Sequence, residues 1–152
     1  QPMNNPVISP MCMEDLDDIE TIENLSFQIP WPRQAFVREL CENTLARYFT
    51  VRDNGRAVAY GGMWLILDEA HITNIAVHPR YRGKGIGKAL LKGMIDYGIS
   101  KGIKSFTLEV RESNHVAIAL YSRLGFKRAG TRKGYYSDTR EDAVIMWLRI
   151  PD

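Results

Sequence analysis

The chain has 152 residues, a length that suits one domain with a single hydrophobic core. Its apolar fraction of 45% and charged fraction of 25% are ordinary for a globular protein, and no apolar run approaches the roughly 20 residues of a membrane helix. The 20 basic and 18 acidic side chains give a net charge of +2, which is too even for a nucleic-acid-binding surface. We therefore expect a single domain over residues 3–152, with neither a membrane nor a nucleic acid as partner.

Hydrophobic periodicity and turn residues predict an alternation of strands and helices. The turn Asp53-Asn54-Gly55 indicates a hairpin, and Gly102 stops a helix whose apolar stripe includes Ile99. A strand–helix–strand unit at 70–110 favours a central parallel pair within an otherwise antiparallel sheet. The fold class is therefore α/β, a mixed sheet flanked by helices. In chain order we expect an edge strand at 7–11, helices at 14–25 and 33–42, strands at 47–52, 57–67 and 70–77, a helix at 86–100, a strand at 105–110, a helix at 114–124 and strands at 127–134 and 142–150.

The chain start and the cysteines indicate an intracellular protein. No basic segment followed by an apolar stretch is present, so we expect no secretion signal, and Gln1-Pro2 before Met3 is expected to be a cloning remnant. Cys12 and Cys41 are far apart, which favours free thiols in a reducing cytoplasm. The histidines lack the spacing of metal ligands, so we expect no metal, and each histidine should be structural or exposed. They are His71, His78 and His115.

The segment 82–88 alternates three glycines with cations and leads directly into a predicted helix. Glycine lets a backbone approach a ligand closely, and a helix N-terminus presents unpaired N–H groups and a partial positive charge. A phosphate cradle is therefore predicted, with a flexible loop of solvated cations as the alternative. Ala89 stands where a P-loop has Ser or Thr, and the glycine spacing does not match a dinucleotide fingerprint. The residues of the cradle are Arg82, Gly83, Lys84, Gly85, Ile86, Gly87 and Lys88.

Residues 74–87 resemble the acetyl-CoA-binding motif of the GCN5-related N-acetyltransferases, R/Q-x-x-G-x-G/A, which Arg82, Gly85 and Gly87 match. Motifs farther along resemble the branch of bacterial ribosomal-protein-alanine N-acetyltransferases, over residues 7–149 in all. Pro32 is a departure, because that branch usually has Ser or Thr after Pro-Trp. The matching positions are Pro30-Trp31, Phe36, Leu40, Leu108-Glu109-Val110-Arg111, Ser113-Asn114, Ala117, Ala119-Leu120-Tyr121, Leu124-Gly125-Phe126, Tyr135-Tyr136, Glu141-Asp142-Ala143 and Met146.

The resemblance implies a sheet splayed between the strands 70–77 and 105–110, with acetyl-CoA as cofactor and coenzyme A as product. It implies that the pantetheine arm pairs with the backbone of Ile75, Ala76 and Val77, and that the pyrophosphate lies on the segment 83–88. The N–H of Val77 would steady the oxyanion. Asn114 would hydrogen-bond the arm or cap a helix, and both roles are compatible.

The resemblance also implies the catalytic residues. Glu109 would be the base that deprotonates the amine, directly or through a water, with a salt bridge to Arg111 as the alternative. Tyr121 would be the general acid, with a place in the core as the alternative. The resemblance implies direct transfer with no acyl-enzyme, and the position of Cys12 and Cys41 outside every motif supports this.

The expected substrate site is a groove for an extended peptide N-terminus, lined by the segment 27–31, which ends at Trp31, and by Tyr135 and Tyr136. The implied activity is acetylation of the N-terminal alanine of a small-subunit ribosomal protein. The alternatives are an acetyltransferase that acts on a small amine or on other protein amines, and a non-catalytic acetyl-CoA-binding module; the oligomeric state is left open. Three turn acids, if not merely solvated, would attract a basic substrate. They are Asp68, Glu69 and Glu112.

Overall fold

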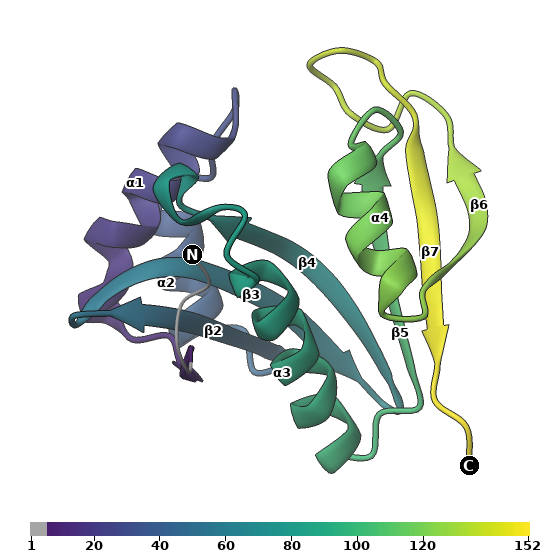
Figure 1. The fold of residues 1–152 in the computed structure, drawn as a ribbon, viewed down its shortest axis with the longest axis horizontal. Coiled ribbons are helices and arrows are strands. Elements are labelled where there is room, and N and C mark those ends of the chain that lie inside the picture. The colour runs from purple at the N-terminus through teal and green to yellow at the C-terminus, as the bar shows by residue number, and fades with distance from the viewer. Residues whose placement is uncertain (1–5) are drawn as a thin grey trace.

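The computed structural model describes residues 6–152, so Gln1 and Pro2 lie outside the described residues. Its strands form one seven-stranded sheet, and helices cover both faces of that sheet (Figure 1). The predicted order of strands and helices is confirmed, with two short 3₁₀ helices in addition, because a single turn leaves no periodic pattern. The elements are β1 (Ile8–Pro10), η1 (Met13–Asp15), α1 (Leu16–Ser26), α2 (Arg33–Cys41), β2 (Ala46–Asp53), β3 (Arg56–Ile66), β4 (Glu69–Val77), η2 (Pro79–Tyr81), α3 (Ile86–Ser100), β5 (Ser105–Arg111), α4 (His115–Arg123), β6 (Lys127–Arg132) and β7 (Ala143–Arg149).

The strand order in the sheet is β1-β2-β3-β4-β5-β7-β6. Strands β1 to β4 form an antiparallel meander, β4 and β5 pair in parallel, and β7 pairs antiparallel with both β5 and β6. The mixed sheet, its central parallel pair and the edge position of the first strand are thus confirmed. The insertion of β7 between β5 and β6 leaves no local signal in the sequence, because it depends on pairing between distant segments.

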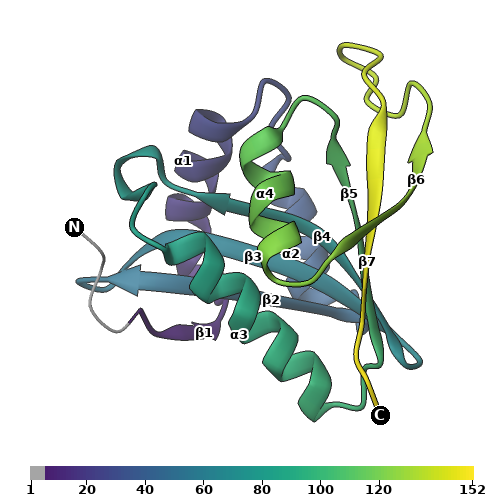
Figure 2. The same cartoon turned by 45° about the vertical axis from the view of Figure 1, so that its right-hand side comes forward.

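Two apolar cores lie on opposite faces of the sheet. Helices α1 and α2 cover one face, and α3 and α4 cover the other, as Figure 2 shows. Phe36 of α2 is fully buried and meets the rings of Tyr48 and Tyr60 edge-on, at centroid distances of 6.2 and 5.5 Å. On the other face the α3 side chains Leu90 and Met94 have no exposed surface. Each helix is therefore held by one apolar stripe, as its periodicity predicts.

The apolar stripe of α3 ends earlier than predicted. Ile99 is 43% exposed, so its assignment to the stripe is wrong. Gly98 takes the contact position instead, because a Cβ there would lie 2.6 Å from Cζ of Phe106. The ring of Phe106 thus occupies the space that a side chain on α3 would fill.

The sheet is splayed between its two central strands, which confirms the predicted splay. Backbone pairing of β4 with β5 covers only three pairs, Glu69↔Ser105, Ala70↔Phe106 and His71↔Thr107. Beyond His71 the two strands diverge and leave a V-shaped opening between the two halves of the molecule (Figure 1). The opening separates the meander, with α1 to α3, from the unit of β5, α4, β6 and β7.

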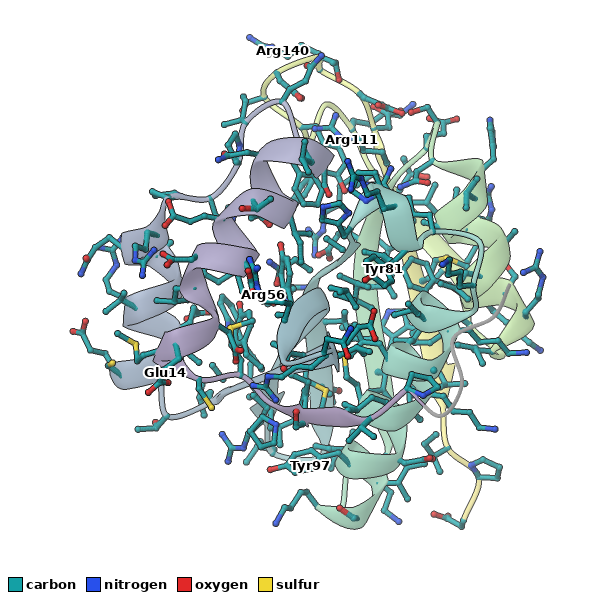
Figure 3. All side chains as sticks on the ribbon, turned by 60° about the vertical axis from the view of Figure 1, so that its left-hand side comes forward. Glu14, Arg56, Tyr81, Tyr97, Arg111 and Arg140 are labelled. Carbon is teal, nitrogen blue, oxygen red and sulfur yellow. The ribbon has the colours of Figure 1, made fainter. Side chains whose placement is uncertain are left out.

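An ion pair and a half-buried carboxylate fasten the helices to the meander. Arg56, labelled beside α1 in Figure 3, donates from Nε to Oδ1 of Asp18 at 3.0 Å, and this bond holds the pKa of Asp18 below its ordinary value. On α2, Oε1 of Glu39 accepts from the hydroxyl of Tyr48 at 2.9 Å and from Nε1 of Trp64 at 2.8 Å. These bonds connect α2 to β2 and β3.

We expect Gly62→Ala to destabilise the protein by about 1–3 kcal/mol, because an added methyl forces side chains off their rotamers. A Cβ at Gly62 would lie 2.2 Å from Cε2 of Tyr48, whose ring is packed and hydrogen-bonded. Gly130→Ala is the matched strand control, since its Cβ would meet only Cδ1 of Ile145 at 3.7 Å. Urea denaturation of both variants measures the difference, and equal stabilities would contradict the expectation.

Candidate active site

A cavity of about 970 Å³ occupies the V-shaped opening. The α1–α2 loop, β4, β5, α4 and the β6–β7 loop all contribute to its walls. A smaller cavity of about 310 Å³ adjoins it and shares Trp31, Thr73 and Glu109 with it. The opening thus brings together all of the predicted catalytic and substrate residues and two of the predicted cofactor residues. Those that line the large cavity are Trp31, Ile75, Glu109, Asn114, Tyr121, Tyr135 and Tyr136.

The remaining predicted residues lie beside the cavity or away from it. The segment 82–88 forms the turn before α3 and the first residues of that helix. The acids Asp68, Glu69 and Glu112 are not among the lining residues, and Glu69 lies at the paired end of β4, so they do not form part of the cavity wall. Other carboxylates line it instead. These are Glu23, Glu109, Asp138 and Glu141.

Strand β4 presents an unpaired edge to the opening. The N–H of His78 donates to the carbonyl of Val58 in β3 at 2.8 Å. In an antiparallel pair the backbone groups alternate in direction, so Ile75 and Val77 direct their N–H and C=O groups away from β3 and toward the opening. Ala76, which was predicted to bind through its backbone as well, faces β3 opposite Tyr60, and its side chain is buried.

The glycine-rich turn has the conformation that its sequence predicts. Gly83 and Gly85 have φ values of 77° and 79°, in the left-handed region that favours glycine. Gly85 is also the N-cap of α3, and no side chain caps the helix there. The first N–H groups of α3 therefore have no partner within the helix. They face the end of the turn as a site for an anion.

The cations of this turn differ in their contacts. Nε of Arg82 donates to the carbonyl of Val77 at 3.0 Å, and its NH2 group donates to the hydroxyl of Ser26 at 3.2 Å. Lys84 extends over the ring of Tyr81, with Nζ 5.3 Å from the centroid. Lys88 is exposed on the first turn of α3. Arg82 thus ties the turn to β4 and α1, while the two lysines surround the helix N-terminus.

Glu109 on β5 has a side chain that is only 11% exposed. Its Oε1 lies 2.7 Å from Nε2 of His71, and its Oε2 lies 3.4 Å from Nε of Arg132. The alternative salt bridge with Arg111 is wrong. Arg111 bonds to Asp138 instead, because the β6–β7 loop folds over the end of β5 and supplies a closer carboxylate.

His71 is the site residue that the sequence analysis missed. It was expected to be structural or exposed, yet it lines the smaller cavity beside Glu109. The only signal was its position on a strand predicted to pair with the strand of Glu109. Without the register of that pair, no contact between the two side chains could be derived.

Tyr121 and Asn114 lie on α4 at the wall of the large cavity. Oδ1 of Asn114 accepts from the N–H of Ala117 at 3.1 Å, so the predicted capping role is confirmed. Tyr121 is half-buried and packs against the ring of Phe126 with centroids 5.7 Å apart. Burial, with a smaller contribution from Tyr136, raises the pKa of Tyr121 to about 12. The phenol therefore keeps its proton throughout the physiological range.

Arg111 orders the β6–β7 loop. Its NH2 group donates to Oδ2 of Asp138 at 2.8 Å, and its guanidinium lies 4.0 Å from the ring centroid of Tyr136. Figure 3 labels Arg111 beneath the part of this loop that carries Arg140. The rings of Tyr135 and Tyr136 meet edge-on at 5.1 Å. Arg111 therefore holds Tyr136 at the cavity, and Tyr135 packs against Tyr136.

The α1–α2 loop forms the opposite wall. Glu23 at its base is 2% exposed, and its carboxylate accepts from the N–H of Trp31 at 2.9 Å. Burial raises the pKa of Glu23. The ring of Trp31 lies 5.4 Å from that of Phe36. Pro32 occupies the N-cap of α2 without a side-chain cap, so the bond to Glu23 orders this loop where a Ser or Thr cap would otherwise contribute.

Comparison with known proteins decides the family. The profile of the acetyltransferase (GNAT) family matches residues 16–126. The chain belongs to this family. A Bacillus subtilis protein is 42% identical to this acetyltransferase over 140 residues, which cover 92% of this chain and 93% of that protein. The ribosomal protein bS18-alanine N-acetyltransferase of Escherichia coli K12 is 41% identical over 145 residues, covering 94% and 97% of the two chains.

The fold agrees with that family. The crystal structure of the ribosomal-protein-S18-alanine N-acetyltransferase from Escherichia coli matches with a TM-score of 0.88 and 39% identity, covering 96% of this chain and 94% of that one. Within residues 6–152, no helix is long and apolar enough to cross a membrane. In the same described part of the acetyltransferase, no three His, Cys, Asp or Glu side chains are grouped to hold a metal ion.

We expect Gly85→Ala to weaken coenzyme A binding about tenfold and to destabilise the fold by about 1–2 kcal/mol, because a Cβ disfavours the left-handed conformation at the cradle. Gly102→Ala is the matched control. It has a φ of 88° and, like Gly85, no atom within 4 Å of an added Cβ, but it lies at the far end of α3. Calorimetric titration with coenzyme A compares the two. Equal affinities of the two variants for coenzyme A would contradict the assignment of the glycine-rich turn as the phosphate site.

Proposed function

We propose that this acetyltransferase modifies the N-terminal alanine of a small-subunit ribosomal protein by direct transfer from acetyl-CoA. The Escherichia coli relative is named for this reaction on ribosomal protein bS18, and its 41% identity spans 94% of this chain. Such a partner implies a cytoplasmic enzyme. The observation that carries the proposal is that one cavity between β4 and β5 has both Glu109, a carboxylate, and Tyr121, a protonated phenol, in its lining.

The residues at the opening fit acetyl-CoA, the cofactor of the family, which supplies an acetyl group activated as a thioester. The edge N–H and C=O of Ile75 and the N–H of Val77 can pair with an amide-containing arm as they would with an added strand, while the carbonyl of Val77 accepts from Arg82. The uncapped N-terminus of α3, behind Gly83 and Gly85, suits the phosphates. Asn114 lines the cavity at the start of α4, where its amide nitrogen is available to the same arm while its oxygen caps the helix.

Glu109 is assigned as the base. An N-terminal amine binds largely as an ammonium ion, which has no lone pair for attack. A carboxylate within hydrogen-bond reach removes one proton, directly or through a single water. Glu109 lines both cavities, so it is accessible to a bound amine although its side chain is largely buried.

Tyr121 is assigned as the acid. Tyr121 is protonated at physiological pH, since burial raises its pKa above the ordinary tyrosine value, to about 12, and it donates that proton to the leaving sulfur. No thiol is required to carry the acetyl group. Cys12 and Cys41 are exposed and are not among the lining residues of the cavity, which supports direct transfer.

The aromatic walls favour a peptide as acceptor. Trp31 on one side and Tyr135 and Tyr136 on the other line both cavities. Trp31 and Tyr135 remain 37% and 50% exposed, so their surfaces are available to a substrate. A chain running between the two loops would place its N-terminal amine at Glu109. A small amine would leave this aromatic surface unused.

The substrate test compares a peptide with the N-terminal sequence of bS18 against spermidine and against the same peptide with a blocked amine, read by thiol release. We expect turnover only with the free peptide. Glu109→Gln, which keeps the shape but not the base, should lower kcat by about 10²–10⁴-fold with coenzyme A affinity kept. Faster turnover of spermidine would overturn the peptide assignment. Full activity of Glu109→Gln would contradict the assignment of Glu109 as the base.

We expect kcat to stay level as the pH rises through 10. Tyr121 acts as the acid in its protonated form. Burial raises its pKa from the ordinary tyrosine value of about 10 to about 12. Tyr121→Phe should lower kcat by about 10²-fold. A pH–rate profile at saturating substrate measures both. A decline of the wild-type kcat centred near pH 10, or an active Phe variant, would count against Tyr121 as the acid.

A further inference from the structure

His71 is the last residue of β4 that pairs with β5, opposite Thr107. Glu109 lies two residues beyond Thr107 on β5, so the side chains of Thr107 and Glu109 project from the same face of that strand. Backbone pairing ends here, yet the side chain of His71 crosses the widening gap and places Nε2 2.7 Å from Oε1 of Glu109. A side-chain bond thus continues the connection between the two strands at the apex of the V.

The two oxygens of Glu109 are held unequally. Oε1 accepts the short bond from His71, whose side chain is 31% exposed. Oε2 has only Nε of Arg132 at 3.4 Å, and the side chain of Arg132 is 55% exposed. The first contact has the length of a strong charge-assisted hydrogen bond, and the second is a loose ion pair of small energy. Oε2 is therefore the oxygen open to an incoming amine.

We propose that His71 is the positioning residue of the base: it fixes Glu109 by Oε1, so that Oε2 meets the amine of the substrate. The inference rests on the proposed function, in which Glu109 deprotonates that amine. In this step an N–H bond of the ammonium breaks, its electron pair stays on nitrogen, and the O–H bond forms at Oε2. Nε2 of His71 carries the hydrogen that Oε1 accepts, so the imidazole gives up no proton.

His71 is itself held by the scaffold. Its ring lies against Trp64 on β3, with centroids 6.0 Å apart and planes at 74°. Nε1 of Trp64 donates to Oε1 of Glu39 on α2 at 2.8 Å, and Tyr48 donates to the same oxygen at 2.9 Å. A continuous set of contacts therefore runs from α2 through β3 and β4 to the base on β5. Rigid support of this kind is what a reacting group needs, because a displacement of about 1 Å can cost about 10²-fold in rate.

Three substitutions in the full-length protein test the proposal, with kcat and KM measured on the bS18 peptide. His71→Ala removes the donor, and we expect kcat to fall on the order of 10–100-fold, with the KM of the peptide changed much less. His71→Gln places an amide N–H where Nε2 was, and we expect it to restore most of kcat. Arg132→Gln removes the loose partner of the same carboxylate and should change kcat by less than about fivefold.

Each outcome supports or contradicts the proposal that His71 positions Glu109. A wild-type kcat in His71→Ala overturns it. A Gln variant as poor as the Ala variant also overturns it, because the imidazole would then act by carrying a proton rather than by donating a bond. Coenzyme A affinity and melting temperature, measured on every variant, separate a local effect from misfolding. If Glu109→Gln is inactive while His71→Ala is normal, the proposed function stands and only this inference fails. If Glu109→Gln is fully active, the assignment of the base fails as well.

Discussion

The constraint on which the site depends is the early end of backbone pairing between β4 and β5. Only three pairs join these strands, although β4 continues to Val77 and β5 to Arg111. Unpaired edge groups within a sheet need partners, because buried N–H and C=O groups are costly to leave without hydrogen bonds. In this protein they border a cavity of about 970 Å³ instead of a neighbouring strand. The interruption in the sheet is therefore the feature that turns an ordinary mixed sheet into a binding site.

Packing on one face holds the two halves of the V together without closing it. The first turn of α3 meets both halves at Gly87, where an added Cβ would lie 3.6 Å from Cγ2 of Val77 and 3.7 Å from Cδ2 of Leu120. Val77 belongs to β4 and Leu120 to α4, so a small residue at this position lets strand and helix come together beside the glycine turn. Together with the paired apex at His71 and the packing of Phe106 against Gly98, this contact joins the halves on one face and leaves the space between β4 and β5 open.

The carboxylates around the cavity have different environments, and this separates their roles. Glu23 is buried under the α1–α2 loop, where burial raises its pKa and its oxygen orders the backbone of Trp31. Glu141 caps the segment after β5, and hydrogen bonds from Ser113 hold its pKa below the ordinary value. Glu109 alone lines both cavities. Glu23 and Glu141 thus support segments that form the walls, whereas Glu109 faces the space that a substrate would fill.

Short-range patterns in the sequence were enough to predict the helices and strands, the glycine-rich turn and the acetyltransferase motif. Each of these patterns depends on residues that are close together in the sequence, so each can be recognised without the tertiary structure. They include the period-two and helical patterns, the hairpin turn at Asp53-Asn54-Gly55 and the alternation of Gly83 and Gly85. The tertiary structure alone decided the insertion of β7 between β5 and β6 and the partners of Glu109. His71 lies 38 residues away along the chain from Glu109, and Arg111, which is two residues away, bonds elsewhere. Which charges meet depends on strand register and on where pairing stops, and both are set by packing across the whole sheet rather than by neighbouring residues.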